Sequence, residues 1–376
     1  MKALTSRERL DRCFKQMETD RPGLSVRGVG FNRPKDETYK PLRELVVEKG
    51  DLVEDFRLPE IEGTTRLDFS ERNDSSRFSV KKDQFNDDFT RYTCTLHTPE
   101  GDLSQQYMVG KKGQGYIVKH FIETPEDAEK YLTLENERIV VDFDKFFELD
   151  RKIGDRGIVL IKPCQNPAGT VVTLMGSERF AYWSIDHRDI LHRLMERRRD
   201  YILDAVKILI ENKVGPYFSL SGQEEVTPPL HGLKDFYDFN VKYDKPIVDL
   251  IHNAGGYVHI HSHGSLSKVL DGFLDIGMDV LHPIEPPPMG DVPARVAKEK
   301  FRGKVCIEGN IQIGDMYTCE SEEIRNMVME LIKDTYDDSK GLIVCQSASP
   351  YIRGMSQKVF DNYSMLIQTV LNYKKT

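Results

Sequence analysis

The chain has 376 residues, of which 39% are hydrophobic and 30% are charged, enough for a large buried core in one or two domains. Its 53 basic and 61 acidic residues give a formal net charge of −8, which argues against nucleic-acid binding, because neutralising phosphates requires a basic surface. Six cysteines without CxxC spacing, no apolar leader and no run of about 18 apolar residues predict a reduced, cytoplasmic protein that does not span a membrane.

The N-terminal part predicts a helix followed by a strand. Thr5 and Glu8 form a capping-box pattern at the start of an amphipathic helix over residues 5–17. Gly23 to Val29 is expected to form the first strand, and residues 31–75 are expected to form helical and loop segments.

A small β flap is predicted next. Residues 85–120 alternate Thr, Tyr and Val with polar residues on both sides of a turn at Pro99-Glu100-Gly101-Asp102. Such alternation around a Gly-containing turn is typical of a hairpin or a small antiparallel sheet.

From about residue 155 onward, short apolar runs alternate with long helical patterns. Repeated β-then-α units predict a parallel sheet with right-handed crossovers. Together with Gly23–Val29 and material around 170–176, the runs suffice for a closed (β/α)8 TIM-type barrel. An open doubly wound sheet is the alternative, but no GxGxxG or P-loop follows any strand. We therefore expect residues 1–376 to form a single barrel domain with the 85–120 flap as an insertion. The remaining strand candidates are Ile158–Lys162, Tyr217–Leu220, Val258–His263, Val280–Ile284, Val305–Glu308 and Leu342–Cys345.

Three histidines recur at every second position between Val258 and Gly264. Because side chains of a strand alternate between its faces, His259, His261 and His263 are predicted to point the same way. Imidazole is the commonest protein metal ligand, and neighbouring side chains on one face can share an ion. The pattern therefore favours a metal site over the alternative, a polar plug inside a barrel.

Carboxylates follow several of the predicted strands, at the end where barrel enzymes place their active sites. Ionised carboxylates are costly to bury without partners, and a divalent metal would compensate them. His261, His263 and one carboxylate would form a three-ligand site with an open position, which is typical of catalytic zinc, although other divalent transition metals also fit. The residues alone leave the identity of that carboxylate open. The candidates are Glu224, Glu225, Glu285 and Glu308.

We take Glu308 as the third ligand and the other three carboxylates as candidate acid–base groups. His259 lies one step deeper in the barrel than His261 and is expected to orient a ligating histidine. His282 precedes a proline and is interpreted as structural. Polar or cationic residues near strand ends are the candidate substrate contacts, although a surface position is the simpler interpretation of the arginine. They are Arg27, Gln223, Asn310 and Tyr351.

Several segments together resemble the uroporphyrinogen decarboxylase superfamily, and the similarity extends over nearly the whole chain. This superfamily of (β/α)8 proteins includes the decarboxylase and the methyltransferases that serve corrinoid proteins. The segments are Thr5–Leu10 with Asp20-Arg21-Pro22, Pro99–Leu103, His261-Ser262-His263-Gly264 in place of the family's His-x-Cys-Gly element, Ile276–Pro283, Glu308–Ile311 and Asp361-Asn362.

Two departures bear on the activity that the resemblance implies. The Arg-rich segment that grips porphyrin carboxylates in the decarboxylase is replaced by Arg27–Arg33 with different spacing, which argues against porphyrinogen decarboxylation. In the thiol-methylating members zinc is held by His, Cys and a later Cys. Here His263 stands at the first Cys position, and the later one falls near Ala348, three residues from Cys345.

The leading hypothesis is a metal-dependent methyltransferase that moves a methyl group from a methyl ether or similar small donor to a corrinoid supplied by a partner protein. The second is a metal-independent decarboxylase or lyase, in which Arg27, Arg33 or Arg353 binds a small carboxylate and His261 and His263 act as acid and base. A metal-dependent hydrolase is disfavoured because its His-x-His pair usually lies on the first strand, and a non-enzymatic binding module is disfavoured by the ionisable groups at strand ends. The chain could also form a homodimer.

Overall fold

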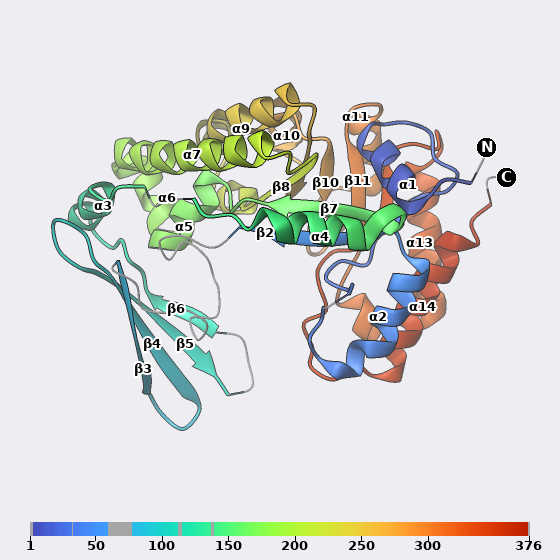
Figure 1. Cartoon of the computed structure of the whole chain (residues 1–376), viewed down its shortest axis with the longest axis horizontal. Helices are drawn as coiled ribbons and strands as arrows, with labels where there is room; N and C mark the ends of the chain where they lie inside the picture. The colour runs from blue at the N-terminus through green and yellow to red at the C-terminus, as the bar shows by residue number, and fades with distance from the viewer. Residues whose placement is uncertain (1–2, 32, 59–76, 112–114, 137–138, 375–376) are drawn as a thin grey trace.

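The computed structural model of the chain describes residues 3–31, 33–58, 77–111, 115–136 and 139–374 (Figure 1). Its centre is a curled parallel sheet of eight strands in the order β1-β12-β11-β10-β9-β8-β7-β2, which is the chain order read around a barrel. The predicted (β/α)8 TIM-type fold is therefore confirmed. The strands are β1 Gly23–Leu24, β2 Leu52–Arg57, β7 Gly157–Lys162, β8 Tyr217–Ser221, β9 Tyr257–His261, β10 Val280–His282, β11 Cys306–Ile311 and β12 Leu342–Gln346.

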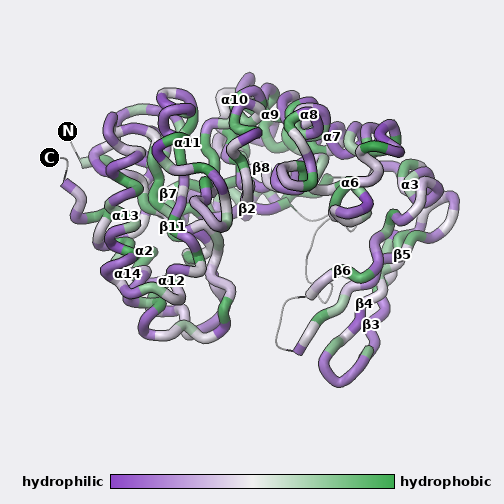
Figure 2. The backbone as a smooth tube through the Cα atoms, turned by 180° about the vertical axis from the view of Figure 1, so that it is seen from behind, coloured by the Kyte–Doolittle hydropathy of each residue, from purple (hydrophilic) through white to green (hydrophobic). Residues whose placement is uncertain are grey.

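Helices follow the strands and cover the outside of the sheet (Figure 1). In Figure 2 they alternate hydrophobic and hydrophilic stretches, as expected for helices with one face on the core. The main helices are α2 Lys40–Lys49, α4 Phe143–Ile153, α5 Pro167–Met175, α6 Ser177–Asp186, α7 Arg188–Glu211, α8 Leu233–Phe236, α9 Lys242–Asn253, α10 Leu270–Ile276, α11 Ala294–Phe301, α12 Asp315–Thr318, α13 Ser321–Thr335 and α14 Gln357–Leu371; a π-helical turn, Tyr237–Val241, joins α8 to α9.

Helix α1, Ser6–Phe14, closes the N-terminal end of the barrel. Thr5 and Glu8 form the predicted capping box at its start. Its buried apolar residues belong to one cluster with the inward-facing residues at the beginnings of the strands, so side chains fill this end of the interior. The cluster comprises Leu10, Cys13, Phe14, Ile158, Leu160, Tyr217, Val280, Cys306 and Ile343.

The flap is a four-stranded antiparallel sheet that projects from the barrel between β2 and helix α3, Pro125–Leu132 (Figure 1). The predicted turn at 99–102 connects β4 to β5, but the sheet begins earlier than the predicted residue 85. An apolar cluster that includes Leu96, Leu103, Ala168 and Val171 anchors it to α5. The assignment of residues 1–376 to a single domain stays a prediction. The flap strands are β3 Phe78–Gln84, β4 Phe89–Leu96, β5 Leu103–Gly110 and β6 Gly115–Lys119.

Two strand predictions were wrong. The segment around 170–176 lies almost entirely in helix α5, whose residues are all buried, and a short apolar run does not distinguish a buried strand from a buried helix. The missing strand is β2, within the predicted helical and loop segments, where Glu54 and Asp55 interrupt the apolar pattern. The first strand is also shorter than predicted, ending at Leu24.

The two edges of the eight-stranded sheet meet at Asp51. Its backbone N–H donates to the carbonyl of Leu24 (2.8 Å), and its carboxylate accepts from the N–H of Leu24 (2.8 Å). The same carboxylate pairs with Arg9 at 2.7 Å and Arg21 at 2.8 Å, and the Asp51 side chain is fully buried. One ionised residue therefore links β1, β2 and α1.

Within the described part of the chain, no helix has the length and apolar character needed to cross a bilayer.

Replacing Asp51 by alanine is expected to lower the free energy of unfolding by roughly 3–5 kcal/mol, because two arginines would lose their buried counter-ion. Urea denaturation monitored by circular dichroism measures the change. The matched control is Asp249→Ala, which removes an exposed carboxylate paired with Lys245 at 3.0 Å and should cost less than about 1 kcal/mol. Equal losses in the two variants would contradict the role assigned to Asp51.

Candidate functional site

The polar residues of the barrel interior lie beyond the apolar layer, toward the carboxyl ends of the strands. On β9, His259 and His261 alternate with Val258 and Ile260, which belong to the hydrophobic core. His261 is in register with His282 on β10, and His259 is in register with Ser219 on β8. Alternation thus gathers imidazoles on one side of the strand, as predicted for the first two histidines of the run.

The third histidine of the run lies outside the strand, which ends at His261 rather than at His263 as predicted. The following turn brings His263 back against it, with ring centroids 4.7 Å apart and planes at 85°. The two side chains are neighbours, although by way of a turn and not of strand alternation.

A hydrogen-bond chain fixes the tautomer of His261. The Nε2 of His282 lies 3.1 Å from the carbonyl of Gln346, which can only accept, so this nitrogen carries a proton. Burial, with a contribution from Arg27, holds the pKa of both His282 and His261 well below the usual range, so both rings are neutral. The Nδ1 of His282 therefore accepts from the Nδ1–H of His261 at 2.8 Å, which leaves a lone pair on Nε2 of His261.

His263 is oriented by a buried carboxylate. Its Nδ1 lies 3.1 Å from Oε2 of Glu285, which also accepts from the N–H of Gly264 at 3.2 Å. Burial acts to raise the pKa of Glu285, but these partners outweigh it and the net shift is downward, so the carboxylate stays ionised. Carboxylate contact at one ring nitrogen is the usual way to present the other nitrogen to a metal.

Glu308 is a buried carboxylate without an aligned hydrogen bond in the described part of the chain. Nε2 of His259 lies 3.2 Å from its Oε2, but this nitrogen has no hydrogen-bond partner of good geometry, while Nδ1 of His259 bonds Ser219 Oγ at 2.9 Å. Burial would raise the pKa of Glu308, yet the neighbouring His259 holds it at about 2. His259 was expected to orient a ligating histidine. Its ring nitrogens lie against Ser219 and Glu308 instead, and its role in the site stays a prediction.

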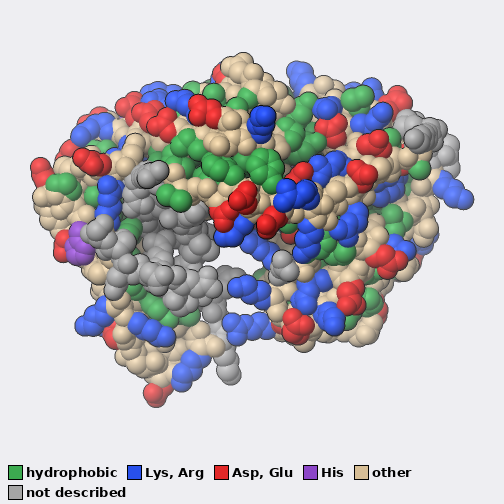
Figure 3. Space-filling model, viewed as in Figure 1, with side chains coloured by type: hydrophobic (Ala, Val, Ile, Leu, Met, Phe, Trp, Pro, Cys, Tyr) green, Lys and Arg blue, Asp and Glu red, His purple; other side chains and the backbone are tan. Residues whose placement is uncertain are grey.

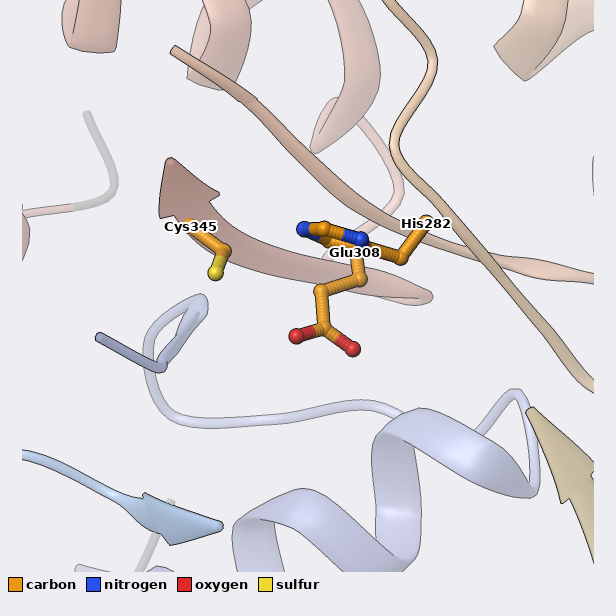
Figure 4. Close-up of side chains that lie close together, drawn as sticks. All are labelled: His282, Glu308 and Cys345. Carbon is orange, nitrogen blue, oxygen red and sulfur yellow. The ribbon is translucent and has the colours of Figure 1, made fainter. Parts of the chain in front are cut away.

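Glu308 also belongs to a group of three potential metal ligands with His282 and Cys345 (Figure 4). Their donor atoms all lie within 4.8 Å of one another, and all three residues are buried. Nitrogen, carboxylate oxygen and thiolate sulfur form a donor set that suits zinc. The predicted set of His261, His263 and Glu308 does not form a group of that spacing here, so it stays a prediction.

Sequence reasoning did not select His282 and Cys345 as ligands. The proline after His282 favoured a structural interpretation of this histidine. Cys345 lies within an apolar run, which is typical of a buried core strand. The only signal was the position of Cys345, three residues from a family ligand position.

The turn after β8 carries Glu224 and Glu225 on a buried amide network. Gln223 donates to the carboxylate of Asp244 at 2.8 Å, which leaves Oε1 of Gln223 without a hydrogen-bond partner, and Asn166 donates to the same carboxylate at 3.1 Å. Burial raises the pKa of Asp244 to about 7 and also raises the pKa of Glu224. The network holds the turn, and Glu224 lies near His263.

The other predicted substrate contacts lie in three different settings. Arg27 lines a cleft of about 370 Å³ with Glu308. Asn310 is buried on β11, in register with Cys345. Tyr351 is 55% exposed in the segment after β12, with its ring 5.2 Å from that of Tyr317.

Comparisons with solved structures found proteins of similar fold. A methyltransferase from Methanosarcina mazei is similar with a TM-score of 0.61 and 14% sequence identity, over 97% of this chain and 98% of that one. A B12-independent methionine synthase from Shewanella sp. W3-18-1 is similar with a TM-score of 0.41 and 13% identity, over 74% of this chain and 72% of that one. No curated protein matches the sequence.

A family model described as uroporphyrinogen decarboxylase (URO-D) matches residues 82–349. The match spans both the flap and the histidine cluster, and it covers well over half of the chain. The resemblance expected from the sequence motifs is confirmed: the protein belongs to the uroporphyrinogen decarboxylase family.

Proposed function

We propose that this protein is a metal-dependent methyltransferase that moves a methyl group from a small methylated substrate, such as a methyl ether, to a corrinoid protein. The observation that carries the proposal is the pair His261 and His263. Each ring has its Nδ1 occupied by a buried partner, so that Nε2 is left for a ligand. The family and its similarity to a methyltransferase fold support the proposal.

His261 and His263 would hold the metal through Nε2, with Glu308 as the carboxylate ligand. The donor set fits zinc or another divalent transition metal. His282 is less suited, because both of its ring nitrogens are already hydrogen-bonded. Cys345 is less suited because burial strongly raises the pKa of its thiol. A metal ion in this site would supply Lewis acidity toward the oxygen of the methyl donor.

Two of the three acid–base candidates, Glu285 and Glu224, differ in their surroundings. Glu285 is ionised and bonded to His263, so its role is to orient that ring. Burial favours the protonated form of Glu224, which makes this carboxyl a suitable proton donor. Glu224 would give its proton to the departing oxygen as the bond between methyl carbon and oxygen breaks, and a corrinoid supplied by the partner would be the methyl acceptor.

Apolar side chains exposed around the mouth of the barrel support a partner that docks there. Leu230, Met289 and Tyr351 follow β8, β10 and β12 respectively, and each is more than half exposed. Exposed aromatic and Met side chains are enriched at protein interfaces. A corrinoid protein at this face would bring its methyl acceptor over the histidine cluster.

A metal-independent decarboxylase is the alternative function. The guanidinium of Arg27 has no partner among the described residues and would bind a substrate carboxylate. Metal content separates the two functions, because this alternative needs no metal.

Metal analysis of the untagged protein is expected to find about one zinc or similar ion per chain. In the double variant His261→Ala, His263→Ala this metal should be lost while the circular dichroism spectrum is unchanged, because both residues lie at the polar end of the barrel. A wild-type protein that binds no stoichiometric metal would contradict the metal-dependent mechanism and favour the decarboxylase.

The variant Cys345→Ser tests the other possible set of metal ligands, His282, Glu308 and Cys345. We expect this variant to keep its metal, because Sγ of Cys345 is engaged with the carbonyl of Gln346 at 3.3 Å. Metal loss in Cys345→Ser, with retention in the double histidine variant, would assign the site to His282, Glu308 and Cys345.

Glu224→Gln is expected to slow corrinoid-dependent demethylation by about 10²–10⁴-fold while metal content stays at the wild-type level, because the amide has no proton to give. Single-turnover rates measure the effect. Glu299→Gln, on the exposed face of α11, should leave the rate unchanged. Comparable rates in both variants would remove Glu224 from the mechanism.

A further inference from the structure

The cleft that contains Arg27 opens beside the seam between β1 and β2. It holds about 370 Å³ and is lined by β2, β7 and β11 and by the segments that follow β1 and β12. Figure 3 shows Lys and Arg side chains gathered along the hollow on this face. The charged residues of the lining are Arg27, Arg33, Lys35, Arg57 and Lys162 against Glu54, Asp55 and Glu308.

Internal pairing does not neutralise this positive charge. Asp55 alone serves three cations, with Lys162 at 2.7 Å, Arg57 at 2.9 Å and Arg33 at 3.3 Å. Glu54 is largely buried, which raises its pKa, and its carboxyl accepts from the N–H of Phe31 instead of pairing with a cation. The lining therefore keeps an excess of positive charge.

Arg27 has no hydrogen-bond or ion-pair partner for its guanidinium in the described part of the chain. Its backbone, by contrast, is held on both sides: Gln346 accepts from its N–H at 3.2 Å and donates to its carbonyl at 2.9 Å. A half-buried guanidinium that is held in place without a partner is prepared for an anion from outside.

Lys162 faces the same space from the end of β7, with 16% of its side chain exposed. Burial, together with the charges of Arg27 and Arg57, lowers its pKa to about 7 against the opposing effect of Asp55. An anion bound in the cleft would reduce the repulsion among these cations, so its binding would be electrostatically favourable.

Glu308 connects the cleft to the histidine cluster, because it lines the cleft and touches His259. A ligand whose anionic end lies at Arg27 and Lys162 would extend toward the candidate metal site. The volume suits a small organic acid and is at the lower end of the range for ligand pockets.

We infer that the methylated substrate of this protein is a small carboxylic acid, whose carboxylate is bound by Arg27 and Lys162 at the β1–β2 seam. The inference rests on the proposed function for the methyl group and adds the chemical class of the molecule that carries it. The planar fork of Arg27 matches a carboxylate through two parallel hydrogen bonds.

Calorimetric titration of the protein as purified tests the inference without using activity. The probes are 4-methoxybenzoate and methoxyacetate, each compared with its neutral amide, and inorganic phosphate. At least one acid should bind the wild type ten times or more tightly than its amide. Arg27→Gln and Lys162→Gln should each remove that preference, and Lys304→Gln, an exposed lysine at the opposite end of the barrel before β11, should keep it.

Two results would overturn the inference. One is that neither acid is distinguished from its amide by the wild type, or that both cleft variants keep the preference. The other is that phosphate binds as tightly as the acids, which would define a phosphate site. Arg27→Gln removes a side chain that makes no hydrogen bond or ion pair with the described residues, so it should fold even if Lys162→Gln does not.

The same titration on His261→Ala, His263→Ala separates this inference from the proposed function. Preference for the acid that is retained in this variant would show that the anion site does not need the histidines. Preference for the acid in a wild-type protein that holds no metal and transfers no methyl group would support the anion site while the methyltransferase proposal fails. Transfer from a neutral methyl ether, without any preference for acids, would support the methyltransferase and overturn the anion site.

Discussion

The fold depends on a single buried carboxylate where the barrel closes. Seven of the eight gaps between strands are bridged by parallel pairing, but β1 is only two residues long and lies beside β2 without a ladder. Asp51 joins them by one backbone bond and one side-chain bond to Leu24, while Arg9 and Arg21 neutralise its charge. The ion pairs of Asp51 close the barrel at the N-terminal end of β2. Toward the carboxyl ends of β1 and β2 the two strands are not joined, and the cleft that contains Arg27 lies in that opening.

The interior of the barrel is divided along its axis. The layer at the start of the strands is apolar and packs against α1, so it supplies hydrophobic stabilisation. The layer beyond it contains imidazoles and carboxylates, which are costly to bury unless each finds a partner. Most are satisfied by one another, as His282 is by Gln346 and His263 is by Glu285. A charged group of this layer that has no such partner is a candidate to bind a ligand.

Much of the fold could be predicted from the sequence, because apolar runs and histidine alternation are local signals. His259 and His261 were placed on one face correctly, since strand periodicity decides this within five residues. Strand β2 was missed because Asp55 points into the cleft and breaks the apolar pattern. The proximity of Glu308 to Cys345 depends on the pairing of β11 with β12, which no local pattern contains. The free lone pair of His261 depends on a chain through His282 and Gln346, across three strands.

Arg27 and Glu308, which both lack an aligned partner among the described residues, carry opposite charges and line the same cleft. Arg27 lowers the pKa of Glu308, so the two charges interact, yet no ion pair joins them. A direct ion pair would satisfy both groups. They stay apart because Gln346 holds the backbone of Arg27 through two hydrogen bonds, while Glu308 lies against His259. A cation beside Glu308 and an anion beside Arg27 would satisfy each group separately. A metal and a carboxylate substrate have these two charges, and the cleft is where both could bind together.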